Sequence, residues 1–488
     1  MSYIRKKKNK SGKIYAYEVT AKWDKEKKQS RSVSKYLGVV DEKTDQIIPK
    51  GSKPPKISKK LVSELQADDA VINDFGNGFL VTESIKKSAI YHPLSDIFKD
   101  YPQLLILMAY RLCQPGAMYN CNLWLEGNVL SNSAVNKSLS SQDISRLLGY
   151  LGKESVQRTF FEQYSSLNQG GAKNVVIDAT SLPNQINSDF NAWGYSDGGI
   201  DKQFRFHCVV DQITKKPLFY RCVPGNISDV SSLQATVQEL KALGINNSFA
   251  LMDASFCSEE NVKTLREHNI DFLMRLPAGR LLYKNMIASH AKEMENLTNA
   301  VKFNQRSLFV TVYPTEDLYG QKGYIYMILD PHQKAKAIQA LIEERSLQKP
   351  EEQDQQKDNF SFSQAGIFML ISSKAIDTQE VLGAYYTRQV VEQIFGFSKS
   401  ELELLPIRCH SAETIRGYLF LQFLLLIVYI EMRERLEGHF TVEQALILTR
   451  NLKCKIYSKN IIVQELTKKQ KKIFDLSSII VPTQITGI

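Results

Sequence analysis

Residues 174–180 read NVVIDAT, and residues 249–255 read FALMDAS. Each stretch is a short apolar run that leads into an aspartate, Asp178 in the first and Asp253 in the second. Runs of this length are typical of buried strands. A carboxylate at the end of such a strand is costly unless it is paired, hydrogen-bonded or bound to a metal. The alternative is that each aspartate only caps a turn or the following helix.

The residues around these stretches alternate in the same way between short apolar runs and helical patterns. Strands are predicted at 175–177, 204–210, 218–223, 249–252, 272–276 and 366–371, and helices at 230–243 and 258–268. Two of the strands form a hairpin around the turn at 211–217. Between 281 and 364 the alternation is interrupted by an inserted segment with strands at 308–313 and 324–329 and an exposed loop at 348–359. The fold class is therefore α/β, with a mixed sheet and a β-rich insertion.

A third carboxylate, Glu392, belongs to an unusual spacing further along the chain. The pattern Y-x2-R-x3-E-x6-K is formed by Tyr385, Arg388, Glu392 and Lys399. On one continuous helix these positions fall within about 60° of one another, which predicts a single charged stripe. A break at Gly396 would carry Lys399 off that stripe. An ordinary surface helix with an Arg–Glu pair would give the same pattern and only about 0.2–0.5 kcal/mol of stabilisation.

Taken together, three carboxylates from two strand ends and one helix form the oxygen ligand set that a hard divalent cation requires. Two Mg²⁺ ions held in this way can bind both the attacking and the leaving oxygen of a phosphodiester. Other polar residues are interpreted more simply. His207 is predicted to be a hydrogen-bonded core histidine, and Asp229 to cap the helix that starts near Val230.

The charge of the chain is concentrated at its N-terminus. The 488 residues carry a formal net charge of +10, but residues 1–60 hold 18 Lys and Arg against 6 Asp and Glu. The block Arg5-Lys6-Lys7-Lys8 opens this region, and interleaved aromatic residues such as Tyr15 and Tyr17 predict short strands rather than a disordered arm. A basic cluster of this kind is suited to the phosphates of nucleic acid. A solvated, partly disordered arm is the alternative.

Composition and apolar patterning divide the chain into six segments. These are a basic β module (1–60), a helical domain (61–167), the first part of the α/β domain (168–280), the β-rich insertion (281–364), the second part of the α/β domain (365–440) and a basic C-terminal region (441–488). The seven cysteines are scattered and include no C-x2-C pair, so neither a zinc site nor a disulfide framework is expected. The apolar run 418–430 is too short to cross a membrane and is predicted to be a buried core helix.

The constellation of Asp178, Asp253 and Glu392 within the Tyr-Arg-Glu-Lys spacing resembles the DDE transposases of bacterial insertion sequences, in the branch defined by that signature. Further matches lie between the carboxylates, at Gly194-Tyr195-Ser196 with Asp201-Lys202-Gln203, at Pro224-Gly225-Asn226 with Ser228-Asp229, and at 258–261. The resemblance covers about 175–277 and 366–411. It implies an RNase H-like catalytic domain with a β-rich insertion between the second aspartate and the glutamate.

The resemblance also implies roles for individual residues. Asp178, Asp253 and Glu392 would be the catalytic metal ligands, for two Mg²⁺ ions, with Mn²⁺ as a substitute. The DNA-binding residues would be Tyr385, Arg388, Lys399 and Lys202, and the positive charge of the N-terminal block adds Arg5, Lys6, Lys7 and Lys8. Partners would be double-stranded DNA, as terminal inverted repeats and target, and a second copy of the chain on paired ends. A cytoplasmic, nucleoid-associated bacterial protein with no membrane contact is expected.

The implied activity is cut-and-paste transposition by metal-dependent cleavage and strand transfer. Two alternatives remain open at this stage. One is a DNA-binding protein derived from such an enzyme that no longer cuts, and the other is an RNase H-like nuclease without strand transfer. The three tryptophans, Trp23, Trp124 and Trp193, lie outside the insertion, so the residues do not decide whether a DNA hairpin is an intermediate.

Overall fold

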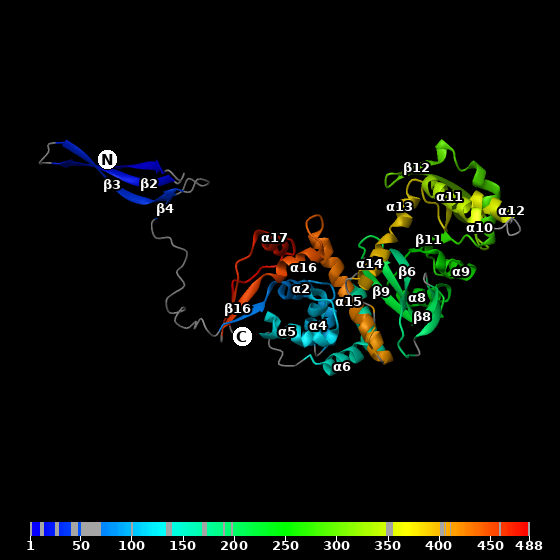
Figure 1. Ribbon diagram of the computed structural model, residues 1–488, viewed down its shortest axis with the longest axis horizontal. Helices are drawn as coiled ribbons and strands as arrows, with labels where there is room; N and C mark the ends of the chain where they lie inside the picture. The colour runs from blue at the N-terminus through cyan, green and yellow to red at the C-terminus, as the bar shows by residue number, and fades with distance from the viewer. Residues whose placement is uncertain are drawn as a thin grey trace. The chain divides into compact units, whose positions relative to one another are not determined.

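The computed structural model divides the chain into two compact units, Met1–Val71 and Ile72–Ile488 (Figure 1). Each unit is considered on its own. The structure describes residues 2–9, 14–24, 29–40, 47–49, 70–98, 101–132, 139–167, 173–188, 191–196, 199–347, 355–400, 405, 407–409, 411–457 and 460–486. The statements below concern these residues.

The N-terminal unit is one small antiparallel sheet. Its strands, in spatial order, are β1 (Ser2–Lys8), β2 (Ile14–Asp24), β3 (Gln29–Val40) and β4 (Ile47–Pro49). Strands were predicted here from the interleaved aromatic and β-branched residues. Among the described side chains of this unit, only Ala16, Val19 and Val40 are buried and apolar, so the sheet has very little core of its own.

The second unit is built on a ten-stranded mixed sheet. In spatial order its strands run β12-β13-β14-β15-β11-β10-β6-β8-β7, and β9 also pairs with β8. The bounds are β6 (Asn174–Pro183), β7 (Ala192–Ser196), β8 (Gly199–Asp211), β9 (Pro217–Pro224), β10 (Phe249–Met252), β11 (Asp271–Leu276), β12 (Ala300–Phe303), β13 (Arg306–Thr315), β14 (Gly323–Leu329) and β15 (Ile367–Ser372). The predicted mixed α/β class is therefore confirmed.

The register of the parallel strands sets the two aspartates side by side. β6 and β10 pair in parallel with Ile177 opposite Met252, so the next residues, Asp178 and Asp253, lie together where β10 ends. β10 is buried along its whole length between β6 and β11. A central parallel strand is covered on both faces, which explains its unbroken apolar sequence.

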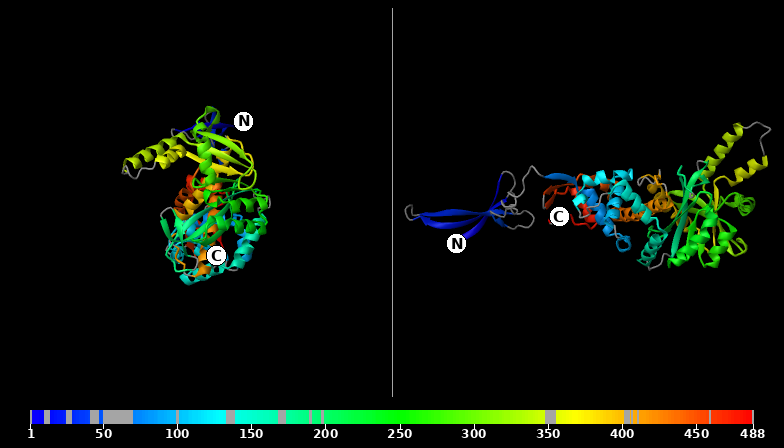
Figure 2. Two further views of the ribbon diagram at one scale, coloured as in Figure 1. Left: turned by 90° about the vertical axis from the view of Figure 1, so that its right-hand side faces the viewer. Right: turned by 90° about the horizontal axis from the view of Figure 1, so that it is seen from below.

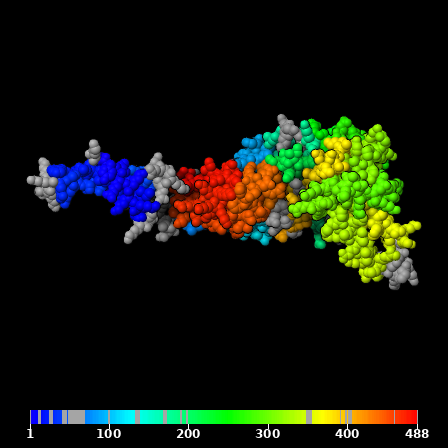
Figure 3. Space-filling model, turned by 90° about the horizontal axis from the view of Figure 1, so that it is seen from above, coloured from blue at the N-terminus to red at the C-terminus, as the bar shows by residue number. Residues whose placement is uncertain are grey.

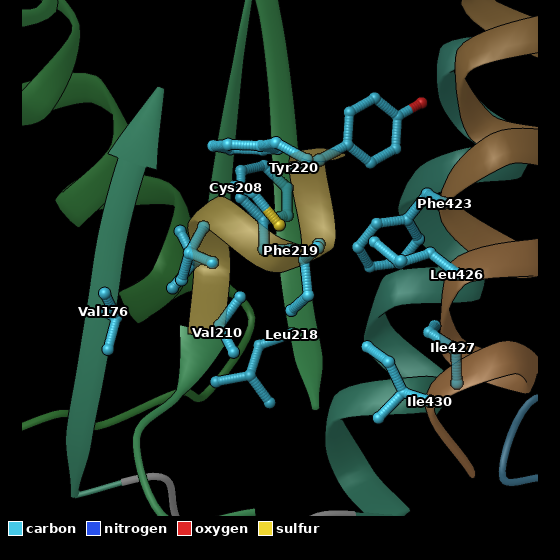
Figure 4. Close-up of a cluster of buried hydrophobic side chains, with 14 of the residues drawn as sticks. Val176, Cys208, Val210, Leu218, Phe219, Tyr220, Phe423, Leu426, Ile427 and Ile430 are labelled. Atoms are coloured by element: carbon cyan, nitrogen blue, oxygen red, sulfur yellow. The ribbon is translucent and has the colours of Figure 1, made fainter. Parts of the chain in front are cut away.

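Helices cover the sheet near this edge. They are α8 (Asp229–Ala242), α9 (Glu259–Glu267), α13 (Val381–Tyr386), α14 (Gln389–Ser400) and α15 (Ala412–Leu436). α15 packs on β9, and α14 packs on β6. Figure 4 shows the core between them, with Phe219 of β9 and Val210 of β8 facing Phe423 and Ile427 of α15. Burial of these apolar side chains, each worth roughly 1.5–3 kcal/mol, fixes the sheet against α15.

α15 is the one described helix long and apolar enough to cross a membrane, and 89% of its most apolar window is buried inside the unit. It is therefore the core helix predicted from residues 418–430, although it is longer than that run. The apolar run underestimated the length of the helix, because the ends of α15 carry charged residues such as Glu413 and Arg433.

The inserted segment extends the central sheet instead of forming a separate one. β14 pairs with β15 over 324–329, and β13 and β12 follow outward. The segment also contains the helices α10 (Leu281–His290), α11 (Pro331–Leu347) and α12 (Gln355–Gln364), and Figure 2 shows α11 and α12 projecting from the unit. The expected loop at 348–359 is wrong for residues 355–359, which are helical in α12, and residues 348–354 lie outside the described part of the chain.

The remaining elements combine the segment after Val71 with the C-terminus. The helices are α2 (Gly76–Lys86), α3 (Tyr91–Ile97), α4 (Tyr101–Cys113), α5 (Cys121–Glu126), α6 (Ser141–Leu151), α7 (Glu154–Leu167), α16 (Val442–Arg450) and α17 (Lys468–Leu476). A four-stranded sheet has the order β18 (Gln484–Thr486), β17 (Asn460–Val463), β16 (Lys453–Tyr457) and β5 (Val71–Asp74). Figure 3 shows the C-terminal residues in red and orange beside the light blue residues that follow β5.

The prediction of a wholly helical pattern from residue 61 is wrong at β5. Phe75 donates its backbone N–H to Leu452 at 3.0 Å, and Cys454 Sγ lies 3.7 Å from the carbonyl of Asn73. Because the strand's partner lies more than 370 residues further along the chain, local periodicity could not indicate it.

Candidate active site

Three carboxylates meet in one cleft of about 950 Å³. Asp178 comes from β6, Asp253 follows β10, and Glu392 lies in the first turn of α14. The side chain of Asp178 is almost buried, that of Asp253 is one third exposed, and that of Glu392 is half exposed. The sequence predicted these three residues from separate segments, and the fold brings them together.

A single guanidinium joins the three carboxylates. Arg388 donates from Nη1 to Asp178 Oδ2 at 2.9 Å and from Nη2 to Glu392 Oε1 at 2.8 Å, while Nη2 lies 3.9 Å from Asp253 Oδ1. Three formal negative charges therefore share one positive charge, which leaves the cluster acidic. Burial alone would lower the pKa of Arg388, but Asp178 and Asp253 raise it further above its ordinary value. Arg388 thus stays charged at every pH at which the protein is folded.

Asp178 occupies the least hydrated position of the three. Burial raises the pKa of its carboxyl from 3.8 to about 6, and the Arg388 charge and the Ala179 amide act in the opposite direction. Asp253 adds to the increase because a second negative charge nearby disfavours ionisation. The remaining lone pairs of Asp178 are partly satisfied by the backbone N–H of Ala179 at 2.9 Å.

Tyr385 contacts two members of this cluster. Its hydroxyl donates to Asp253 Oδ1 at 3.5 Å, and its ring centre lies 5.7 Å from the Arg388 guanidinium. Burial raises the pKa of Tyr385 to about 12, so the hydroxyl keeps its proton and remains a donor. These two contacts orient the Asp253 carboxylate and the Arg388 guanidinium.

The predicted continuous helix from Tyr385 to Lys399 is wrong. α13 ends at Tyr386 and α14 begins at Gln389, with Thr387 and Arg388 in a turn between them. The backbone tightens there, since Arg388 N–H reaches the carbonyl of Tyr385 at 3.2 Å and the Thr387 hydroxyl donates to the Ala384 carbonyl at 2.6 Å. The turn swings the arginine inward over the aspartates.

Gly396 does not break the helix, because α14 continues to Ser400. Lys399 therefore follows Glu392 by two turns, and its Nζ donates to Thr180 Oγ1 at 2.7 Å. Thr180 lies two residues beyond Asp178 on β6. Lys399 thus stands on the wall of the cleft, beside the carboxylates rather than among them.

Lys202 lies elsewhere on the unit. It belongs to the β7–β8 hairpin, where its Nζ lies 5.9 Å from the ring centre of Trp193. Trp193 is 61% exposed. Tyr195 of the same hairpin lines the cleft, but Lys202 is not among the described residues that line it. The block Arg5, Lys6, Lys7 and Lys8 forms most of β1 in the N-terminal unit.

A second buried charge cluster lines the same cleft and was missed. Arg205 of β8 donates from Nε and Nη2 to the two oxygens of Asp229 at 2.8 and 2.5 Å, and both residues face the cleft. His207 Nε2 lies 3.3 Å from Asp229 Oδ1, and its Nδ1 lies 2.9 Å from Ser232 Oγ. Burial alone would raise the pKa of Asp229, but His207 and Arg205 hold it below its ordinary value.

This cluster corrects the prediction for Asp229. The cap of α8 is Ser228, whose hydroxyl accepts from the Ser231 N–H at 3.3 Å, while Asp229 is the first helical residue and ties α8 to β8. The prediction for His207 is confirmed, since it is 1% exposed and contacts Ser232. Arg205 and His207 are two residues apart in β8, so they lie on the same face of the sheet. This spacing was the signal in the sequence that could have indicated a shared partner.

The donor set fits a divalent cation, but the present geometry does not. Carboxylate oxygens are the ligands that Mg²⁺ prefers. Nevertheless, no group of three His, Cys, Asp or Glu side chains in the described chain is arranged to hold a metal, because all three carboxylates turn toward Arg388. The excess negative charge around Arg388 favours the binding of a cation.

The family model described as a transposase DDE domain matches residues 169–428, more than half of the chain. No curated protein matches. Among solved structures, a piggyBac transposase synaptic complex with hairpin DNA is 11% identical with a TM-score of 0.37, covering 82% of this chain and 69% of that chain.

A Drosophila P element transposase strand transfer complex is 9% identical with a TM-score of 0.17, covering 65% of this chain and 86% of that chain. Neither structural similarity is close enough to bear on function. The family match is different in kind, because it spans all three carboxylates and the sheet that positions them. The chain therefore belongs to the family of transposases with a DDE domain.

Proposed function

We propose that the protein is the transposase of a bacterial insertion sequence, of the branch with the Tyr-Arg-Glu-Lys signature. It binds terminal inverted repeats, cuts DNA at the element ends and joins them to target DNA by a cut-and-paste route. The observation that carries this proposal is the meeting of Asp178, Asp253 and Glu392 in one cleft around Arg388. An RNase H-like catalytic domain is supported by the strand order β9-β8-β6-β10-β11, with β6, β10 and β11 parallel.

In the proposed mechanism the three carboxylates hold the catalytic cation, Mg²⁺ or in its place Mn²⁺. When bound, two such ions would stabilise the charge of the phosphate and lower the pKa of the attacking water or 3′-hydroxyl. The protein contributes positioning, because β6 and β10 hold Asp178 and Asp253 in fixed register. Tyr385 keeps Asp253 oriented through its hydroxyl.

Arg388 and Lys399 are the proposed phosphate-binding groups of the cleft. A guanidinium binds phosphate through a planar fork of N–H donors, and an ammonium acts as a point charge. In the cleft both cations stand beside the carboxylates, so a scissile phosphate placed there has positive charge on its flanks. In this proposal Arg388 binds the carboxylates before DNA and metal are bound. Once they are bound, it binds a DNA phosphate instead.

Three further parts of the proposal concern the DNA contacts outside the cleft, the oligomeric state and the location in the cell. Lys202 and the N-terminal unit contact DNA outside the cleft, a second copy of the chain binds the other element end, and the protein acts in the cytoplasm on the nucleoid. The net charge of residues 1–60 supports the DNA contact. Dimeric assembly rests on the resemblance alone.

One experiment tests the function. The full-length protein is incubated with a labelled duplex that carries the element's own end, a target plasmid and Mg²⁺. We expect a cut at the end and a joined product, and neither product from the matched variant Asp178→Asn, whose side chain has the same shape.

Binding without cuts in the wild type would contradict the enzyme and favour a DNA-binding derivative. Cuts without joined products would favour a nuclease. Thermal unfolding of the Asp178→Asn variant shows whether it is folded, so that an inactive variant is not mistaken for an unfolded one.

A further inference from the structure

The strand register of the N-terminal unit divides the basic block between two faces. Alternate residues of a strand point to opposite sides of the sheet, and directly paired residues share a side. Lys6 pairs with Ala16 and Lys8 with Ile14, whereas Arg5 pairs with Tyr17 and Lys7 with Tyr15. Four consecutive cations in the sequence are thus two pairs on opposite faces.

The face that carries Lys6 and Lys8 collects further cations from β2 and β3. Lys22 pairs with Arg31, and Lys35 pairs with Glu18, and each lies on the same side as Lys6 because the strands alternate in step. We define the basic face by the residues Lys6, Lys8, Lys22, Arg31 and Lys35. Glu18 is the one acidic residue on it among the side chains that the structure describes.

The other face is aromatic. It carries Tyr15, Tyr17 and Tyr36, whose rings lie together with centroids 5.4 Å apart for Tyr17–Tyr36 and 6.0 Å for Tyr15–Tyr36. Arg5 and Lys7 are its only cations among the described residues, and each is paired directly with a tyrosine. Five of the described cations of these strands therefore lie on the basic face and two on the aromatic face.

The basic face is open to solvent around its cations, while Ala16 and Val40 on the same side of the sheet are buried. Its five cations are all exposed, and between them Ile4 and Val33 are 55% and 51% exposed. A sheet of a few strands with both faces exposed has little independent stability, and this one buries only three apolar side chains. Covering one face with a partner would supply the contacts that the unit lacks.

Charge complementarity selects the partner. Residues 1–60 carry a net charge of +12 and the rest of the chain −2, so the excess positive charge of the protein resides in this unit. Duplex DNA presents a dense row of phosphates, and its major groove admits a two-stranded β ribbon. Exposed apolar residues between the cations would meet base edges, where a thymine methyl is the apolar partner.

We propose that the basic face of the N-terminal sheet docks on duplex DNA, with Lys6, Lys8, Lys22, Arg31 and Lys35 against phosphates and Ile4 and Val33 toward the groove. The aromatic face turns away from the DNA. This inference rests on the proposed function, because it names the surface by which the transposase holds its substrate outside the cleft.

The sequence offers a matched test on adjacent residues. Two full-length variants each lose two charges from β1, Lys6→Gln with Lys8→Gln on the basic face and Arg5→Gln with Lys7→Gln on the aromatic face. Affinity for a fluorescent duplex is measured without divalent metal over a range of KCl concentrations. The basic-face pair should reduce the slope of log K against log[KCl] by about two, one for each lost phosphate contact, while the aromatic-face pair changes it by less than about half of that.

Equal effects of the two pairs would overturn the inference, since a non-specific basic arm loses the same charge in both cases. It would also be overturned if the basic-face pair bound DNA normally but lost binding to phosphatidylserine vesicles or lost self-association in sedimentation. The double variant Lys6→Arg with Lys8→Arg should retain the wild-type slope, which separates charge from folding. Cleavage by the wild-type protein is scored separately, so a failure of the enzyme proposal and a failure of the docking face give different results.

Discussion

Two of the three described sheets of this protein use charge in opposite ways. At the edge of the ten-stranded sheet, Asp178, Asp253 and Glu392 are gathered around Arg388 inside a cleft. On the N-terminal sheet, five cations stand in solvent on one face with a single described acidic residue. Buried charges must be paired, because desolvation is expensive, whereas exposed charges can be kept for a partner.

In one sheet the charges interact with one another within the chain, and in the other they are exposed to solvent. In the cleft, charges already interact within the chain, so changing one of them alters both the fold and the chemistry. On the basic face the charges are exposed, so changing them is expected to alter the stability of the fold only slightly.

The largest effect is expected for Asp253→Asn. The substitution keeps the shape of the side chain but removes a proposed metal ligand, and metal stabilisation of transition-state charge contributes several kcal/mol. Single-turnover cleavage of the labelled element end should fall by more than roughly 10³-fold. Affinity for the duplex without metal should stay within about threefold of wild type, and cleavage at the wild-type rate would remove Asp253 from the site.

The next effect is expected for Asp229→Asn, which leaves Arg205 without its buried counter-charge. Removing one member of a buried ion pair costs about 3–5 kcal/mol, and the partner atoms here are 2.5 and 2.8 Å apart. Urea unfolding should show this loss. The exposed pair Lys322–Glu316 is the control, since both side chains are 81% exposed and Glu316→Gln should change stability by less than about 0.5 kcal/mol.

A smaller effect is the pH dependence of stability due to Asp178. Its pKa is raised from 3.8 to about 6 in the folded protein, so the folded state binds more protons than the unfolded state between these values. Stability without divalent metal should therefore fall as pH rises from about 4 to 6, by at most roughly 3 kcal/mol, and stay level above that. The slope should be lost in Asp178→Asn, as measured by thermal unfolding in EDTA, and an unchanged slope would assign it to another group.

The smallest effect is expected for the stability of the double variant Lys6→Gln with Lys8→Gln. These side chains are exposed, and surface substitutions usually stay within about 0.5 kcal/mol. Thermal unfolding should therefore match the wild type while DNA affinity falls. A loss of several degrees would show that these cations stabilise the fold, and the contrast between the two sheets would not hold.

Local patterns were sufficient to predict the strands that carry the aspartates. β6 and β10 are short apolar runs bounded by turn residues, and the period of the pattern is a property of the strand itself. The helices at 229–242 and 259–267 were predictable for the same reason. The spacing of Glu392 from Arg388 was visible, and so was its place on a helix.

The features that local patterns could not predict depend on contacts between residues that are far apart in the sequence. The turn at Thr387 and Arg388 could not be predicted, because Arg388 is drawn to Asp178 and Asp253 from other strands. β5 has its partner near the C-terminus. The division of Arg5-Lys6-Lys7-Lys8 over two faces requires knowing that the block is a strand, since a disordered arm has no faces.

The way the inserted segment joins the sheet has a mechanical consequence. β15 is hydrogen-bonded to β14 on one side and to β11 on the other, with six paired residues from Tyr324–Ser372 to Leu329–Ile367. A hinge between the insertion and the catalytic edge would have to break this ladder. A force applied to the inserted strands would therefore be transmitted through this ladder toward the strands that carry the aspartates.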